Sequence, residues 1–280
     1  MNAIEMKGLT KNYPGFTLGP LDLSLPAGCI LGLVGENGAG KSTTIKLILD
    51  MVHRDSGSIT VLGYDNVKDF HLTNEEIGVV LDDVGIPDCL DTKKVGKIMS
   101  GIYRNWDQQA YEGYLAKLSI PAGKPFKDFS RGNKMKLGIA IALSHGAKLL
   151  ILDEATSGLD PVVRDEVVTL FHEFTREPGN SILISSHIVS DLEKLCDYIA
   201  FLHKGKLLLC EEKDVLLGEY GIVRGTAEQL SVIQPDAVIG RKINAYGGEM
   251  LVKRSAAPAE MAVSPITIEE LFLFMIKEAK

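Results

Sequence analysis

The glycine-rich segment GENGAGKST, residues 35–43, is the feature that most constrains how this chain can fold. It follows the continuous apolar run CILGLVG and precedes an apolar-periodic helix expected at about residues 42–51. Glycines between a buried strand and a helix let backbone N–H groups turn inward, at a helix N-terminus whose dipole favours anions. The spacing and its context therefore predict a phosphate-binding loop, and an ordinary glycine turn that caps a helix is the alternative.

The loop also supplies side chains for a nucleotide. Lys41 is placed to reach the β- and γ-phosphates, and the Ser42 hydroxyl is placed to bind Mg²⁺. We expect nucleotide contacts from the whole segment, which comprises Gly35, Glu36, Asn37, Gly38, Ala39, Gly40, Lys41, Ser42 and Thr43.

A pair of carboxylates follows a second buried strand. The segment KLLILDEATSGLD places Asp153 and Glu154 side by side where that strand ends. Adjacent carboxylates repel, and burial penalises both unless a cation or a proton-transfer role offsets the cost. Downstream of a phosphate loop, Asp153 is placed to hold Mg²⁺ and Glu154 to act as a base or to orient an attacking water. The alternative is a solvated pair at a strand end.

The other apolar runs predict an α/β fold. Short apolar runs alternate with helical segments, which is typical of a mainly parallel sheet covered on both faces. These runs are SITVLG, IGVVL, KLLILD, SILISS and YIAFL. Near the N-terminus, LDLSL alternates as a half-buried antiparallel strand does. Residues from about 84 to 148 are mostly helical, and strand patterns resume afterwards, so we expect a helical insertion.

We expect two regions in the chain, a domain over residues 1–210 and a C-terminal extension over residues 211–280. The extension contains KINAYGGEMLVKR, which predicts a hairpin around Gly247 and Gly248. A last helix is expected to start at Thr267, with Glu270 completing a capping box. Its LFLFMI segment is apolar around the whole helix and must be covered, either by a second subunit, as a dimer lock, or by its own subunit.

Composition excludes some classes of protein. A net charge of −7 argues against an extended nucleic-acid-binding surface. No apolar run approaches the roughly 20 residues that span a bilayer, and the N-terminal residues lack a signal-peptide pattern. We therefore expect a cytosolic chain that acts at a membrane only through a partner. The cysteines lack metal-site or disulfide-scaffold spacing and are interpreted as reduced thiols; they are Cys29, Cys89, Cys196 and Cys210.

His187 differs from the other histidines in its position. It follows the strand SILISS, at the carboxyl end where ligands of open α/β sheets collect. A lone histidine is more often structural, and that interpretation is kept for His53, His71, His145, His172 and His203.

The segment FSRGNKMKLGIAIAL joins a polar start to an apolar helical stripe. Its first turn is either simply solvated or an anion-binding site. Such a site would use the hydroxyl of Ser130, the accessible N–H of Gly132 and the positive end of the helix dipole. The sequence alone does not show which molecule would supply the anion bound at this site.

Taken in order, GENGAGKST, FSRGN, LLILDE, SGLD and SSH resemble the ATP-binding subunit of an ABC transporter, over about residues 1–210. The chain most resembles bacterial ATPases that serve ABC-2-type exporters of drugs, antimicrobial peptides or phenol-soluble-modulin-like toxins. Two longer stretches carry this resemblance, SRGNKMKLGIAIALSHGAKLLILDEATSGLDPV and TIEELFLFMIKE. The resemblance implies a P-loop ABC ATPase fold with ATP and Mg²⁺ as cofactors.

The resemblance also implies a role for each matching position. Tyr13 is similar to the aromatic residue that stacks on adenine, and Asp153 and Glu154 to the magnesium-site aspartate and the general base. Asp160 resembles the D-loop aspartate, and His187 resembles the switch histidine that contacts the γ-phosphate.

Residues 129–133 stand where the family carries its signature, usually Leu-Ser-Gly-Gly-Gln. In the family this segment binds the γ-phosphate of ATP held by the other subunit of a head-to-tail dimer. Ser130 and Gly132 keep the serine and one glycine, whereas Arg131 and Asn133 depart from the pattern. The resemblance implies that Arg131 either strengthens the grip on the γ-phosphate or points to solvent.

A second departure is Asp82, in IGVVLDD, where the family has a glutamine that senses Mg²⁺ and the attacking water. Asp83 is the other residue that could align with this glutamine. An aspartate can coordinate Mg²⁺, but it adds negative charge and donates no hydrogen bond when ionised.

Together these features predict two ATP-binding subunits, identical or different, that close on two ATP molecules and open after hydrolysis. We expect them to drive a separately encoded permease from the cytoplasmic face of the membrane, with no nucleic-acid partner. The helical insertion is expected to receive the coupling helices of the permease, unless it serves only packing. A soluble ABC ATPase of DNA repair or translation is the alternative, which a single cassette without a coiled coil disfavours. A P-loop kinase is disfavoured by the signature segment.

Overall fold

The apolar runs form a six-stranded sheet in the computed structural model, which describes residues 1–82, 84–244, 247–258 and 261–278. The strand order is β10-β9-β3-β8-β7-β6, and every neighbouring pair is parallel except β10 with β9. The predicted mainly parallel sheet is therefore confirmed. Its strands are β3 (Ile30–Val34), β6 (Ile77–Val80), β7 (Leu149–Asp153), β8 (Ser181–Ser186), β9 (Tyr198–His203) and β10 (Lys206–Glu212).

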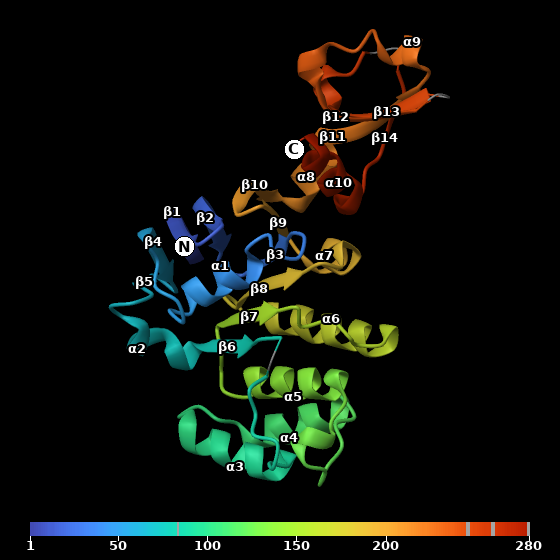
Figure 1. The fold of residues 1–280 in the computed structure, drawn as a ribbon. Helices are drawn as coiled ribbons and strands as arrows, with labels where there is room; N and C mark the ends of the chain where they lie inside the picture. Colours follow the sequence, from blue (N-terminus) through green and yellow to red (C-terminus); the bar gives the residue numbers. More distant parts are fainter. Residues whose placement is uncertain (83, 245–246, 259–260, 279–280) are drawn as a thin grey trace.

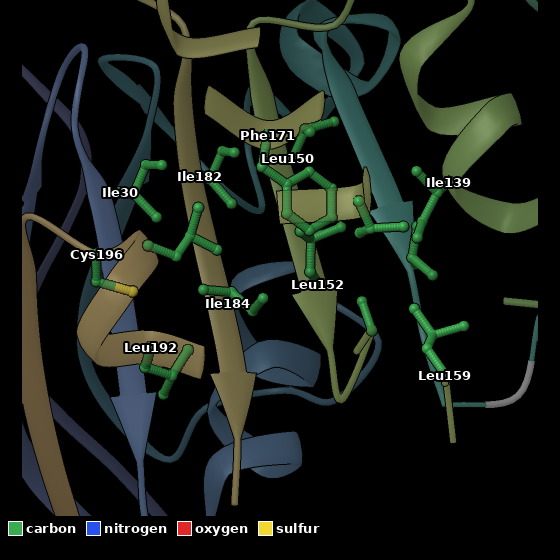
Figure 2. Packing of buried hydrophobic residues seen from close by; sticks show 14 of the residues in the cluster. Ile30, Ile139, Leu150, Leu152, Leu159, Phe171, Ile182, Ile184, Leu192 and Cys196 are labelled. Carbon is green, nitrogen blue, oxygen red and sulfur yellow. The ribbon is translucent and has the colours of Figure 1, made fainter. Parts of the chain in front are cut away.

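This sheet is covered on both faces, because alternate residues of its strands enter two different cores. Leu150 and Ile182 pack with Phe171 and Leu192 in one core (Figure 2), whereas Leu183 packs in the other with the N-terminal sheet. Burial on both faces explains why the strands are continuous apolar runs without alternation. The helices nearest the sheet are α1 (Lys41–Ile48), α5 (Arg131–Leu143), α6 (Pro161–Thr175) and α7 (Val189–Leu195).

The N-terminal region forms a second, antiparallel sheet in the order β2-β1-β4-β5. Leu21, Leu23 and Leu25 are buried and alternate with exposed residues along β2, as predicted. The strands are β1 (Asn2–Tyr13), β2 (Phe16–Pro26), β4 (Ser56–Val61) and β5 (Tyr64–Asp65), followed by α2 (Phe70–Thr73) and the 3₁₀-helix η1 (Asn74–Glu76).

Helices occupy the segment between β6 and β7, and they gather at one end of the molecule (Figure 1). Asp91, Asp107 and Ser130 cap α3, α4 and α5 by accepting a backbone N–H of the first turn. The elements here are α3 (Thr92–Ile102), α4 (Gln108–Lys117), η2 (Phe126–Asp128) and α5. The limits of this helical region at 84 and 148, and the end of the main domain at 210, stay predictions.

The C-terminal region adds a third sheet at the opposite end of the molecule, in the order β12-β13-β11-β14 (Figure 1). The predicted hairpin is present as the antiparallel pair β12 and β13, but Gly247 and Gly248 are the first residues of β13, paired with Asn244 and Ile243, and do not form its turn. The elements are α8 (Lys213–Glu219), β11 (Tyr220–Gly225), α9 (Ala227–Leu230), η3 (Pro235–Ala237), β12 (Val238–Asn244), β13 (Gly247–Lys253), η4 (Arg254–Ala256), β14 (Val263–Ser264) and α10 (Ile268–Glu278).

The last helix, α10, packs against its own chain. The Phe272 ring lies 5.0 Å from the Phe201 ring of β9, and the Ile268 N–H donates to Glu193 Oε2 on α7 at 3.1 Å. The expected capping box is formed, since Glu270 N–H donates to Thr267 Oγ1 while Thr267 N–H donates to Glu270 Oε2. Of the two alternatives for covering this apolar helix, packing on its own subunit is therefore the one observed.

We predict that Phe272→Ala lowers the free energy of unfolding by about 3–5 kcal/mol, because it opens a cavity between α10 and the core sheet. Leu273→Ala, at a residue that is 43% exposed, should change it by less than about 0.5 kcal/mol. Denaturant unfolding of both variants checks the pair. Equal losses would show that α10 does not stabilise the core through Phe272.

Candidate functional site

A pocket of about 790 Å³ lies at the carboxyl end of the core sheet. The parallel strands β3, β7 and β8 all end at this edge, which brings the segments that follow them together. The pocket is lined by Phe16, Glu36, Asn37, Gly38, Gly40, Lys41, Ser42, Thr43, Asp82, Arg131, Asp153, Glu154, Ser157 and His187. Most residues singled out from the sequence therefore meet in one place.

Two glycines of the loop at residues 35–43, Gly35 and Gly40, are required by close packing. Gly40 has φ +112°, and a Cβ there would come within 2.6 Å of Leu18 Cδ1. A Cβ at Gly35 would come within 2.5 Å of the Leu202 carbonyl oxygen. The backbone can therefore turn tightly and start α1 at Lys41 only because these positions carry no side chain.

Lys41 carries a buried positive charge into the loop. Its side chain is 6% exposed, and its Nζ donates to the carbonyl oxygens of Gly35 at 2.7 Å and Glu36 at 3.3 Å. The same ammonium group lies 3.6 Å from Glu154 Oε1. Hydrogen bonds and a carboxylate thus compensate the burial of this charge, as a buried ion requires.

Ser185 of β8 organises the carboxylate pair. Its hydroxyl donates to Asp153 Oδ1 at 2.5 Å and accepts the Glu154 N–H at 3.2 Å. Glu154 has φ +55°, a left-handed conformation that is costly for a residue with a side chain. Sequence reasoning missed Ser185, and the only signal was its place two residues before His187.

His187 is brought against Glu154 from the neighbouring strand end. Its Nδ1 lies 2.6 Å from Glu154 Oε2, and its side chain is half exposed toward the pocket opening. The histidine and the carboxylate come from β8 and β7, which are adjacent in the sheet, so the parallel register produces their contact. Glu154 therefore has Lys41 at one carboxylate oxygen and His187 at the other.

The signature segment begins α5. Ser130 is the N-cap of this helix, and its Oγ accepts the Asn133 N–H at 3.2 Å. Gly132 lies in the first turn and is half-buried. Both residues stand at an exposed helix N-terminus, where anions are favoured.

Arg131 meets Asp82 of its own subunit. Arg131 Nη2 donates to Asp82 Oδ1 at 2.5 Å. The structure thus places Arg131 in an ion pair, which neither of the two alternatives drawn from the resemblance anticipated. Residue Asp83, the other alignment considered for the glutamine position, lies outside the described residues.

The remaining predicted residues lie around this pocket without lining it. Among the described residues, Phe16 rather than Tyr13 is the aromatic residue in the pocket wall. The two face each other across the turn between β1 and β2. Asp160 is the N-cap of α6, accepting the Val163 N–H at 3.1 Å, and Pro161 stands in the first turn of this helix.

The donor set suits Mg²⁺ bound together with phosphates. The Ser42 hydroxyl and the Asp153 carboxylate line the same pocket, and Mg²⁺ prefers such oxygen ligands. Asp82, the third ligand predicted from the sequence, also lines the pocket, but its carboxylate is paired with Arg131. In the described part of the chain, no group of three or more His, Cys, Asp or Glu side chains could hold a metal by itself. Proteins usually bind Mg²⁺ through one or two carboxylates together with substrate phosphates.

Comparison with known proteins identifies the family. The sequence profile of the ABC transporter family matches residues 18–157. The chain is 36% identical over 218 residues to the lantibiotic transport ATP-binding protein SrtF of Streptococcus pyogenes, a match that covers 75% of this chain and 91% of that protein. It is 33% identical over 210 residues to the bacitracin transport ATP-binding protein BcrA of Enterococcus faecalis, covering 73% and 68%.

A solved structure of an ATP-binding subunit of an ABC transporter has the same fold, with a TM-score of 0.69 and 26% identity over 76% of this chain and 90% of that one. The fold and the pocket thus define an ABC ATPase cassette. The chain belongs to the ABC transporter family as an ATP-binding subunit, and it is an ATPase whose hydrolysis is coupled to transport. No helix in the described residues is long and apolar enough to cross a bilayer.

We predict that Ser185→Ala weakens ATP hydrolysis by about 10- to 100-fold, because Asp153 loses the hydroxyl that orients it. The free energy of unfolding should fall by about 1–3 kcal/mol. Steady-state ATPase assays over a range of Mg²⁺ concentrations, with denaturant unfolding in parallel, check both effects.

The matched control is Ser181→Ala, at the other end of β8, where the hydroxyl accepts the Gly28 N–H at 2.9 Å. This variant should lose stability while keeping its turnover and Mg²⁺ requirement. If both variants lose activity equally, Ser185 acts through the stability of β8 and not through Asp153.

Proposed function

We propose that this chain pairs with a second ATP-binding subunit, closes on ATP, and powers a separately encoded membrane permease that exports a drug or an antimicrobial or toxic peptide. The observation that carries the proposal is the single pocket that joins the phosphate loop, Asp153, Glu154 and His187. The names of the relatives support the class of cargo, since one is a lantibiotic transporter and the other a bacitracin transporter.

Each side chain of the pocket has a task in this proposal. Lys41 and the N–H groups at the start of α1 hold the β- and γ-phosphates. Ser42 and Asp153 would hold Mg²⁺, which supplies charge neutralisation to the phosphates when bound, whereas the carboxylate of Asp82 is already paired with Arg131. Glu154 accepts a proton from the attacking water, and His187 holds the Glu154 carboxylate in place and lies where it can contact the γ-phosphate.

The aromatic side chains at the β1–β2 turn would bind the adenine base. Tyr13 is 39% exposed and can stack on a base, and Phe16 already lines the pocket wall. We therefore assign adenine stacking to Tyr13 with Phe16 as its neighbour across the turn.

Dimer closure supplies the mechanical step. The exposed first turn of α5, with Ser130 and Gly132, can bind the γ-phosphate of ATP held by the partner subunit. The carbonyl oxygen of Gly158 is close to Gly132, and Asp160 lies two residues after Gly158. Asp160 therefore lies near the first turn of α5. Such contacts with the partner's ATP exist only in the closed state. Moving a population from 1:99 to 99:1 requires about 5.5 kcal/mol of differential affinity, which ATP must provide through them.

The permease would hold this subunit at the cytoplasmic face of the membrane. The helical region between β6 and β7 presents exposed apolar side chains on α3, namely Ile98 and Ile102, and these suit the coupling helices of a permease. The subunit would be peripheral, and its partner cassette would be either a second copy or a different chain.

We predict that Glu154→Gln lowers ATP turnover by about 10²- to 10⁴-fold while ATP binding is retained, because the amide cannot accept the proton from water. ATP should then trap a stable dimer, seen by size-exclusion chromatography. Glu173→Gln, which removes a carboxylate from a surface ion pair with Lys117, is the control and should turn over normally. Near-normal turnover of Glu154→Gln would remove Glu154 from the role of base.

We also predict that the chain co-purifies in detergent with a permease of about six apolar spans encoded by a neighbouring gene. Cells that express both should tolerate a higher concentration of peptide antibiotics, and the Glu154→Gln variant should abolish the protection. Failure of the pair to associate, together with ATPase activity stimulated by DNA or ribosomes, would favour a soluble ABC ATPase of DNA repair or translation.

A further inference from the structure

The two positions where this chain departs from the ABC pattern in charge lie against each other. Arg131 stands in the signature segment and Asp82 after β6, 49 residues apart, and their side chains form an ion pair at 2.5 Å. Both residues line the nucleotide pocket. Either change alone would alter the charge of this pocket by one unit, whereas the two together leave it unchanged.

Stability does not account for the pair. Both side chains are 59% exposed, and an ion pair at such a position contributes little to folding. The same exposure leaves the charges open to the pocket, where the neighbouring groups include Glu154, Asp153 and the Lys41 ammonium. An uncompensated carboxylate here would repel the phosphates of ATP.

The stem of Arg131 lies beside the loop that precedes α6. Gly158 has φ +76°, and a Cβ on it would lie 3.4 Å from Arg131 Cδ. The arginine stem therefore lies in contact range of this loop, and its guanidinium group pairs with Asp82. Three segments of one subunit meet at this contact, namely the signature turn, the residue after β6 and the loop before α6.

We propose that Arg131 is a charge-compensating residue of the subunit's own nucleotide site: it neutralises Asp82, so that the aspartate does not repel the triphosphate of ATP bound in the same subunit. Arg131 acts through Asp82 and makes no contact with the phosphates in this role. The inference rests on the proposed use of this pocket for ATP.

The test is a double-mutant cycle on binding of a non-hydrolysable ATP analogue, measured by calorimetry at low salt. Arg131→Gln should weaken binding about fivefold, the effect of one exposed unit charge at close range. The loss should be larger when EDTA removes Mg²⁺, because the free nucleotide carries more negative charge. It should shrink at 1 M salt, where the Debye length falls to about 3 Å.

The decisive measurement is whether a second substitution restores the ATP affinity lost in Arg131→Gln. Asp82→Asn combined with Arg131→Gln should restore the affinity, since the carboxylate that needs compensation is gone. The matched control is Lys134→Gln, which removes one positive charge from the same turn of α5, where Lys134 lies over the Phe126 ring instead of at Asp82. This control should leave the affinity within about twofold, because its charge is not paired in the pocket.

Two results would overturn the inference. If Arg131→Gln weakens binding equally whether or not Asp82→Asn is also present, the arginine contacts the phosphates directly. Unchanged affinity in Arg131→Gln, with the analogue still bound, would mean that it is a surface residue. If the analogue fails to bind the wild-type chain, the proposed use of the pocket fails instead, so the two failures are distinguishable.

Discussion

The burial of one positive charge at the carboxyl edge of a parallel sheet is the interaction on which the rest of this site depends. The Lys41 ammonium group lies between the carbonyl oxygens of its own loop and the Glu154 carboxylate. A buried cation is tolerated only with such partners. The loop must therefore fold tightly around it, and the strand that carries Glu154 must end beside it, which parallel pairing of β3, β8 and β7 ensures.

The same charge balance extends outward from the pocket. Asp153 is satisfied by the hydroxyl of Ser185, Glu154 by Lys41 and His187, and Asp82 by Arg131. Each carboxylate at this edge thus has a donor from a different segment. A nucleotide that brings further negative charge into the pocket must change these contacts, so ATP binding and the positions of the surrounding segments are coupled by electrostatics.

A sheet buried on both faces also requires cover along its whole length. The N-terminal antiparallel sheet and α1 cover one face, and α5, α6 and α7 cover the other. The C-terminal helix α10 continues that cover by packing Phe272 on Phe201 and by donating the Ile268 N–H to Glu193 on α7. The C-terminal region is thus packed against α7, the helix that begins two residues after His187.

Sequence reasoning recovered the local features and missed the long-range ones. The phosphate loop, the carboxylate pair, the mainly parallel sheet and the capping box at Thr267 each follow from residues close together in the chain. Phe16, Ser157 and Ser185 were not anticipated as residues of the site, although Ser157 and Ser185 stand inside the SGLD and SSH segments, because the sequence does not show which side chains these residues contact. Their roles arise only when the start of β2, the segment after β7 and the end of β8 meet.

The sequence by itself determined which chemistry this chain carries, since glycine spacing and side-chain type decide what can hold a phosphate or move a proton. It flagged Asp82 and Arg131 as separate irregularities, each with no visible compensation. Only the tertiary structure decided that they are one ion pair, and that α10 is covered by its own subunit. The physical reason is that Coulombic attraction and burial depend on distances in space, which local sequence patterns do not contain.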